Sequence, residues 1–253
     1  MEWFEAIGLA AAAFVAGAIN TVAGGGSLIS FPALLAAGYP AKPANVTNSV
    51  ALWPGYFGGT MGYRREIAAQ KNRAVALLLP SAAGAVLGSI ILLSTPESAF
   101  EAIVPFLILF ACGLLAVQDT LGEFAAKHRL AANSPNHLPW MMIVAAFALA
   151  VYGAYFGAGL GILMLAALGI LLPDNIQQSN ALKGFLSLVT NAVAVLWFAA
   201  FGPVEWLPAA IMAGGALAGG YLGADAARAL GSGRLRVVVI VYGLVVVVLL
   251  WLT

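Results

Sequence analysis

Two pairs of polar residues open long apolar stretches of the 253-residue chain, one pair in each half. Asn45 and Asn48 lie three residues apart, and Asn180 and Lys183 have the same spacing. On a helix this spacing puts both members of a pair on one face. Polar groups within a membrane helix are costly and face protein or water. Amides and an ammonium group in such a place have the chemistry to hold a small anion.

Both pairs also have a structural interpretation. Asparagine often caps the start of a helix. Lys183 lies six residues into the apolar run 177–201. It is therefore roughly 9 Å along that helix, a distance that its long side chain can span to reach the membrane interface. The sequence leaves the binding and the structural interpretations open.

Two glycine clusters, 24–26 and 157–161, precede the short apolar runs 27–38 and 160–172. Non-helical backbone at membrane depth survives only where protein buries it or water reaches it. We expect free N–H groups at the start of each short helix, where the helix dipole favours an anion. Close helix packing is the alternative role for these glycines, and packing hydrogen bonds are the alternative for Asn20 and Asn191. The predicted substrate-binding residues are Asn20, Gly24, Gly25, Gly26, Ser27, Asn45, Asn48, Gly157, Gly159, Gly161, Asn180, Lys183 and Asn191.

The elements that position these residues are predicted to be membrane helices. Hydrophobic residues make up 62% of the chain and charged residues 8%, whereas soluble domains carry about 25% charged residues. The apolar runs lack the alternation of a membrane β-barrel. A spanning helix needs about 20 apolar residues, and eight runs reach or approach this length: 4–22, 44–63, 73–93, 99–118, 138–156, 177–201, 206–224 and 235–252.

A polar stretch divides the chain into two similar halves. We predict a first membrane repeat at 1–118, a linker at 119–138 and a second membrane repeat at 139–253. One constant offset places Gly24 on Gly159 and Asn45 on Asn180. If each short run crosses the membrane, each half has about five segments. The halves are then inverted, as in many secondary transporters. Re-entrant short runs are the alternative, and this count would then have to be redone.

Lysine and arginine set the predicted orientation. Nine of the eleven cations fall on one side if the linker is cytoplasmic and both termini are outside. The acidic N-terminus, Met1–Glu5, is unlike a basic signal peptide. We therefore expect the first apolar run to be retained.

Several function classes are excluded by what the sequence lacks. The net charge of +1 gives no basic footprint for nucleic acid. The serine-hydrolase, zinc-protease and phosphate-loop motifs are missing. No carboxylate lies at the centre of an apolar run, so the expected membrane interior is neutral to positive and favours an anion. We expect no catalytic residue, no metal site and no cofactor.

Two segments resemble the motifs of the sulfite exporter TauE/SafE family of membrane permeases. The first is Gly17–Leu34 with Pro43–Asn48, and the second copy is Gly157–Gly161 with Gln178–Lys183. The resemblance covers essentially the whole chain. It implies a multi-pass permease of the bacterial inner membrane for sulfur oxyanions or organosulfonates. It leaves the substrate, the coupling ion (proton or sodium) and assembly as a homodimer open.

The sequence therefore predicts a secondary transporter that moves small anions by alternating access through the lipid bilayer. It is predicted not to be an enzyme. An anion channel is one alternative, and a non-transport role in membrane assembly or catalysis is another.

Overall fold

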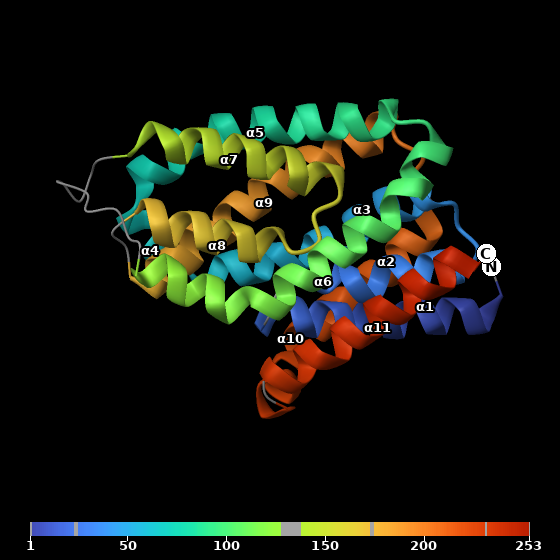
Figure 1. Cartoon of the computed structure of the whole chain (residues 1–253). Coiled ribbons are helices and arrows are strands. Elements are labelled where there is room, and N and C mark those ends of the chain that lie inside the picture. Colours follow the sequence, from blue (N-terminus) through green and yellow to red (C-terminus); the bar gives the residue numbers. More distant parts are fainter. Residues whose placement is uncertain (1, 23–24, 128–137, 173–174, 231, 253) are drawn as a thin grey trace.

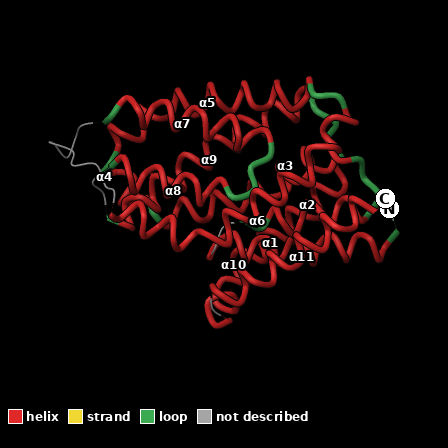
Figure 2. The backbone as a smooth tube through the Cα atoms, in the orientation of Figure 1, coloured by secondary structure: helices red, strands yellow, loops and turns green. Residues whose placement is uncertain are grey.

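The computed structural model describes residues 2–22, 25–127, 138–172, 175–230 and 232–252. These residues form eleven helices and no strand (Figures 1 and 2). The helices are α1 (Trp3–Val22), α2 (Ser27–Ala36), α3 (Ala41–Gly62), α4 (Arg64–Ala69), α5 (Lys71–Ser94), α6 (Glu97–Lys127), α7 (Trp140–Tyr155), α8 (Leu160–Leu171), α9 (Ile176–Phe201), α10 (Trp206–Leu230) and α11 (Ser232–Leu252). The prediction of an all-helical chain is confirmed for the described residues.

Four helices are long and apolar enough to cross a membrane, judged from the described residues: α1, α5, α6 and α9. Further apolar helices, among them α7 and α11, are shorter. The outer surfaces of these helices carry large exposed apolar side chains such as Leu79, Phe106 and Val237. Apolar surfaces of this extent require contact with lipid. The chain is a multi-pass membrane protein.

The two short helices fold back on the helices that precede them. α2 has 10 residues and α8 has 12. They are about 15 and 18 Å long, whereas the hydrocarbon core is about 30 Å thick. Neither short helix can span that thickness alone. α2 packs on α1, and α8 packs on α7. The loop between α7 and α8 therefore lies in the middle of the bundle (Figure 2).

Local sequence explains where several helices begin. The side-chain oxygen of Asn175 accepts from the N–H of Gln178 at 2.9 Å, and the Gln178 side chain accepts from the N–H of Asn175 at 3.1 Å. This reciprocal pair is a capping box that fixes the start of α9. Pro32, Pro54, Pro80 and Pro105 lie inside helices, as membrane helices tolerate.

Two features differ from the expected runs. α6 continues to Lys127, so its last nine residues, 119–127, occupy the first part of the expected linker. Most of the remaining linker, residues 128–137, lies outside the described residues. The short helix α4 joins α3 to α5, in the stretch between the expected runs 44–63 and 73–93.

Two helix pairs pack in a reciprocal pattern between the halves of the chain. α1 packs on α10, and α5 packs on α7. A methyl group on Gly215 or Gly219 would overlap the carbonyl oxygen of Ala10 or Phe14. In the other pair, the same change at Gly84 or Gly88 would overlap the carbonyl oxygens of Phe147 or Val151. Glycine therefore brings the two backbones of each pair into contact.

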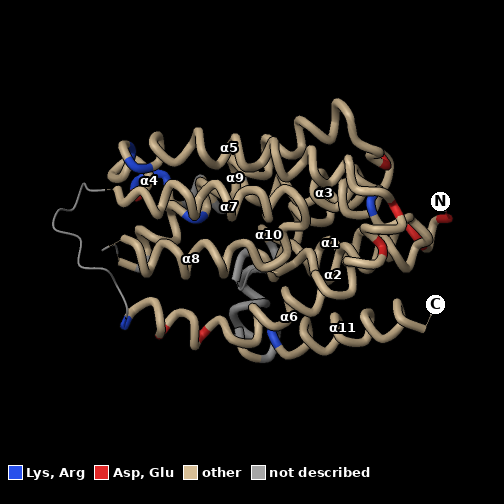
Figure 3. Tube along the Cα trace, turned by 45° about the horizontal axis from the view of Figure 1, so that its top comes forward, with Lys and Arg blue, Asp and Glu red and all other residues tan. Residues whose placement is uncertain are grey.

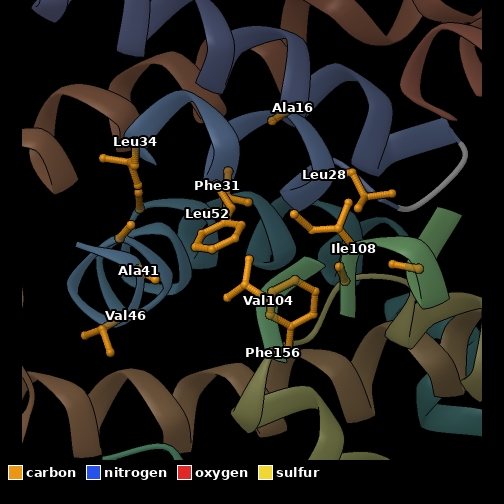
Figure 4. Close-up of a cluster of buried hydrophobic side chains, with 14 of the residues drawn as sticks. Ala16, Leu28, Phe31, Leu34, Ala41, Val46, Leu52, Val104, Ile108 and Phe156 are labelled. Atoms are coloured by element: carbon orange, nitrogen blue, oxygen red, sulfur yellow. The ribbon is translucent and has the colours of Figure 1, made fainter. Parts of the chain in front are cut away.

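A buried apolar cluster joins the two halves around α6. Val104 and Ile108 of α6 lie beside Leu28 and Phe31 of α2 and Phe156 after α7 (Figure 4). The rings of Phe31 and Phe156 meet edge to face, with centroids 5.6 Å apart. A second cluster holds α8 against α5, α7 and α9.

Most charged residues lie toward the ends of the bundle (Figure 3). Acidic residues lie mainly at the end that holds both termini, and basic residues cluster around α4 at the opposite end. α6 ends and α7 begins at the α4 end (Figure 1). Arg236 of α11 binds Asp119 of α6 through two hydrogen bonds of 2.7 and 3.0 Å. This pair fixes α11 against α6.

Candidate functional site

The first glycine break lies between α1 and α2. The side-chain oxygen of Asn20 accepts hydrogen bonds from the N–H groups of Gly26 at 2.8 Å and Gly25 at 3.2 Å. The expectation of free N–H groups here is therefore wrong for these two residues, because a side chain of the preceding helix accepts hydrogen bonds from both N–H groups. Gly24 lies outside the described residues. Ser27 is half-buried as the first residue of α2.

The second glycine break lies between α7 and α8. Gly157 and Gly159 both have φ +79°, a conformation that other residues adopt only with strain. The Tyr152 hydroxyl donates to the carbonyl oxygen of Ala158 and holds the loop. Within the described residues, the N–H groups of Gly159 and Gly161 have no hydrogen-bond acceptor. The second break thus retains the free donors that the first has lost.

Lys183 lies beside the first turn of α8. A methyl group on Gly161 would be 3.8 Å from Cδ of Lys183, so the lysine stem runs past this glycine. Its Nζ donates to Oδ1 of Asn180 at 3.2 Å. Both the pair and the glycine break are half-buried or buried. The structure therefore brings a cation, an amide and unpaired backbone N–H groups together at one place.

The other predicted pair, on α3, is buried and holds neighbouring helices. Asn45 is 1% exposed, and its Nδ2 donates to the carbonyl oxygen of Tyr155 at 2.9 Å. That carbonyl ends α7, where backbone acceptors lack helical partners. Asn48 is 2% exposed, and its Oδ1 accepts from the hydroxyl of Ser30 at 2.5 Å. The atoms that make these bonds are not available to a ligand.

Both breaks flank the middle of α6. A methyl group on Gly25 would be 3.8 Å from Cδ1 of Leu115, and one on Gly159 would be 3.1 Å from Cδ1 of Leu114. Asn45 of the first half reaches the end of α7 in the second. The two breaks therefore meet at consecutive residues of one helix, although they come from opposite halves of the sequence.

Asn191 is placed differently from the rest. Its Nδ2 donates to the carbonyl oxygen of Ser187, one turn earlier in α9, at 2.8 Å. The neighbouring Thr190 is completely buried, and its hydroxyl has no hydrogen-bond partner. A methyl group on Gly153 of α7 would be 3.1 Å from Cγ2 of Thr190. This turn of α9 therefore faces the hairpin of α7 and α8.

Sequence reasoning missed a polar stripe on α3. Asn45, Ser49, Trp53, Tyr56 and Thr60 follow one another at spacings of three or four residues, so they share a helix face. At one end of the stripe Asn45 bonds the second half, and at the other end the Thr60 hydroxyl donates to the carbonyl oxygen of Gly184 at 3.2 Å. Gly184 follows Lys183, so the Thr60 end of this face contacts the segment of α9 that carries the lysine.

Trp53 carries the unpaired donor of this stripe. Its indole Nε1 is buried and has no acceptor. A buried donor that lacks its hydrogen bond costs about 1–3 kcal/mol. Hydropathy scales count tryptophan as apolar, so the Trp53 indole N–H was overlooked within the apolar run 44–63. The spacing of polar atoms along α3 was the signal that could have found it.

The comparison with known proteins covers nearly the whole chain. The model of the family described as "Sulfite exporter TauE/SafE" matches residues 9–250. The chain belongs to this family. No solved structure matches the chain.

Three curated relatives are similar to this chain over most of their length. A protein of Haemophilus influenzae named "Probable membrane transporter protein" is 30% identical, with 90% of this chain and 87% of the relative covered. One from Sinorhizobium, named "Probable membrane transporter protein ORF9", is 29% identical over 87% of this chain and 82% of its own. "Probable membrane transporter protein YfcA" of Escherichia coli is 24% identical, over 90% and 83%.

Proposed function

We propose that this TauE/SafE protein is a secondary transporter of small oxyanions, of which sulfur oxyanions and organosulfonates are the class to test first. The observation that carries the proposal is the Lys183 side chain lying against the first turn of α8, where backbone N–H groups lack acceptors. A helix N-terminus and a nearby cation both favour negative charge. Asn180 orients the ammonium group through its side-chain oxygen.

The proposed anion contacts come mainly from the second half. Nζ of Lys183 balances the charge, and the N–H groups of Gly159 and Gly161 donate to oxyanion oxygens. The Trp53 indole N–H supplies a further donor from the first half, since a buried donor without a partner fits an acceptor-rich ligand. In the first half, Asn20, Asn45 and Asn48 hold the breaks in place through the bonds described above.

Alternating access is proposed from two inverted repeats. α3, α5 and α6 begin at positions 41, 71 and 97, and α9, α10 and α11 begin at positions 176, 206 and 232. The offset that places Asn45 on Asn180 therefore relates all three pairs of helix starts. At this offset α1 is equivalent to α7, and α10 is equivalent to α5. The packing of α1 on α10 therefore has its counterpart in the packing of α7 on α5. Such an arrangement lets one half rock against the other around a central site. We further propose the bacterial inner membrane, with the α4 end cytoplasmic and the termini outside.

The test is uptake into liposomes that contain the purified protein, with labelled sulfite, sulfate, thiosulfate, sulfoacetate and formate. A carrier gives saturable uptake that internal anion accelerates by exchange. A channel gives steady current without exchange. Uptake of none of these anions by folded, inserted protein would contradict the proposal and favour a non-transport role.

The Lys183→Ala variant tests the site itself. We expect anion uptake to fall by about tenfold or more, the loss of one charge-assisted contact, while the melting temperature changes little. Lys127→Ala is the matched control, because Lys127 is exposed at the end of α6. If the Lys183→Ala protein transports normally, the lysine is an interface anchor, and the proposed charge balance is wrong.

A further inference from the structure

Two unpaired acceptor atoms lie away from the proposed anion site, at α4. Oε2 of Glu66 and Oε1 of Gln70 are both buried, and neither has a hydrogen-bond partner. Gln70 as a whole is only 7% exposed. The two residues are four apart and occupy successive turns of one segment. Buried polar atoms are normally paired, so two orphans within one turn require an explanation.

The other atoms of the Gln70 amide fix its orientation. Nε2 donates to the carbonyl oxygen of Gln178 at 3.0 Å and to that of Glu66 at 3.3 Å. Carbonyl oxygens only accept, so the NH2 group must point at them and Oε1 must point away. An ionised Glu66 also only accepts. The pair therefore lacks a donor.

None of the neighbouring charged groups supplies that donor. Arg64 and Arg65 of α4 and Lys71 of α5 are exposed. Arg73 of α5 is buried and has an interaction of its own. α9, the other helix packed on α4, has no titratable side chain among residues 177–182, and Lys183 donates to Asn180.

We propose that Glu66 is a proton-binding residue that makes transport depend on the pH on the side of the membrane that the α4 end faces. Glu66 takes the proton from water at the α4 end and returns it to the same water when the pH rises, and the carboxyl O–H of the protonated form donates to Oε1 of Gln70. One hydrogen thus satisfies both orphan oxygens. A metal cation fits less well, because it needs more oxygen ligands than these two.

The same amide links the proton to the anion site. Gln70 holds the carbonyl of Gln178 in the first turn of α9, and Asn180 and Lys183 follow two and five residues later. Protonation of Glu66 adds a hydrogen bond to Oε1 of Gln70, whose Nε2 already holds α9, so the amide is fixed more firmly in the protonated form. This inference rests on the proposed transport function, since it concerns how that transport responds to pH.

The test compares two assays on the same proteoliposomes, for an anion that the wild-type protein exchanges. In wild-type protein, a pH gradient with the acidic side at the α4 end should raise net uptake at least several-fold above uptake without a gradient. Glu66→Gln cannot take up the proton, so it should abolish that stimulation but keep anion exchange. Glu66→Asp keeps a titratable group and should retain the stimulation. Glu123→Gln, an exposed carboxylate of α6, is the matched control and should behave as wild type.

The outcomes separate the two proposals. Absence of any wild-type exchange would overturn the transport function itself. Normal exchange without an effect of pH gradient, or a full effect in Glu66→Gln, would overturn the proton site alone. If Glu66→Gln does not reach the membrane, Gln70→Met replaces it, because it removes the proposed acceptor. The pH-driven stimulation should then fall at least about twofold, and an unchanged value would contradict the inference.

Discussion

At the residue scale, the two glycine breaks differ in what their backbone N–H groups contact. Asn20 accepts from Gly25 and Gly26 in the first break. Its counterpart in the second half, at the offset that relates the repeats, is Tyr155, which has no amide. The second break therefore keeps its donors and gains Lys183 where the first half has Asn48. We expect that these two differences leave the first break structural and make the second suitable for an anion.

Trp53→Phe tests the proposed contact from the first half. Phenylalanine keeps an aromatic ring but removes the indole N–H, so we expect anion affinity to fall about tenfold, the value of one hydrogen bond to a charged group. Stability should change little, because the gain from removing an unpaired buried donor opposes the packing cost of the smaller ring. Isothermal titration with the transported anion measures the affinity. Trp197→Phe on α9 is the control, and equal affinities in the two variants would remove Trp53 from the site.

At the element scale, the two short helices were predictable and their partners were not. Glycine clusters and polar turns bound both short runs, and α2 and α8 begin at the predicted residues 27 and 160. The bond from Asn45 to Tyr155 joins residues 110 apart in different halves. A contact between residues so far apart in the sequence cannot be predicted from a local pattern. The burial of Asn45 and Asn48 likewise depends on α2 and α7 packing over them.

Two alanine variants at the start of α8 should affect different properties: one should lower stability, and the other should lower transport. Gly159→Ala forces a left-handed backbone on alanine and presses on Leu114, and it should cost about 1–2 kcal/mol of stability. Gly161→Ala meets only Cδ of Lys183 at an ordinary distance, so the fold should persist while transport falls.

Melting temperature in detergent and uptake into liposomes separate these effects. A stable Gly159→Ala protein would mean that the loop adopts another conformation. Full transport by Gly161→Ala would place the anion away from this turn.

At the scale of the whole molecule, the bundle has one acidic and one basic end. Both termini lie at the acidic end, and α6 ends at the other. The sequence predicted that most lysine and arginine residues share one side of the membrane, the pattern that sets the orientation of membrane helices. The extension of α6 to Lys127 was not predicted, because the polar residues 119–127 resemble a linker in the sequence. In the structure they form the exposed end of a helix.

Cysteine labelling in intact cells tests the orientation. Cys112 is buried and gives little background. A membrane-impermeant maleimide should label Trp3→Cys, which is 75% exposed, from the periplasmic side. Lys127→Cys at the end of α6 should react only after the membrane is opened. Labelling of both positions from the same side would contradict the proposed topology.

The reciprocal packing of α1 on α10 has a consequence for how the protein is made. Gly17 lies against Ala216, which is synthesised most of a chain length later. At roughly 5–20 residues per second, translation takes about 10–40 s to produce that partner. During this interval the glycine face of α1 has only lipid, the insertion machinery or a neighbouring chain to contact. The first half of the protein therefore depends on the synthesis of the second for its final structure.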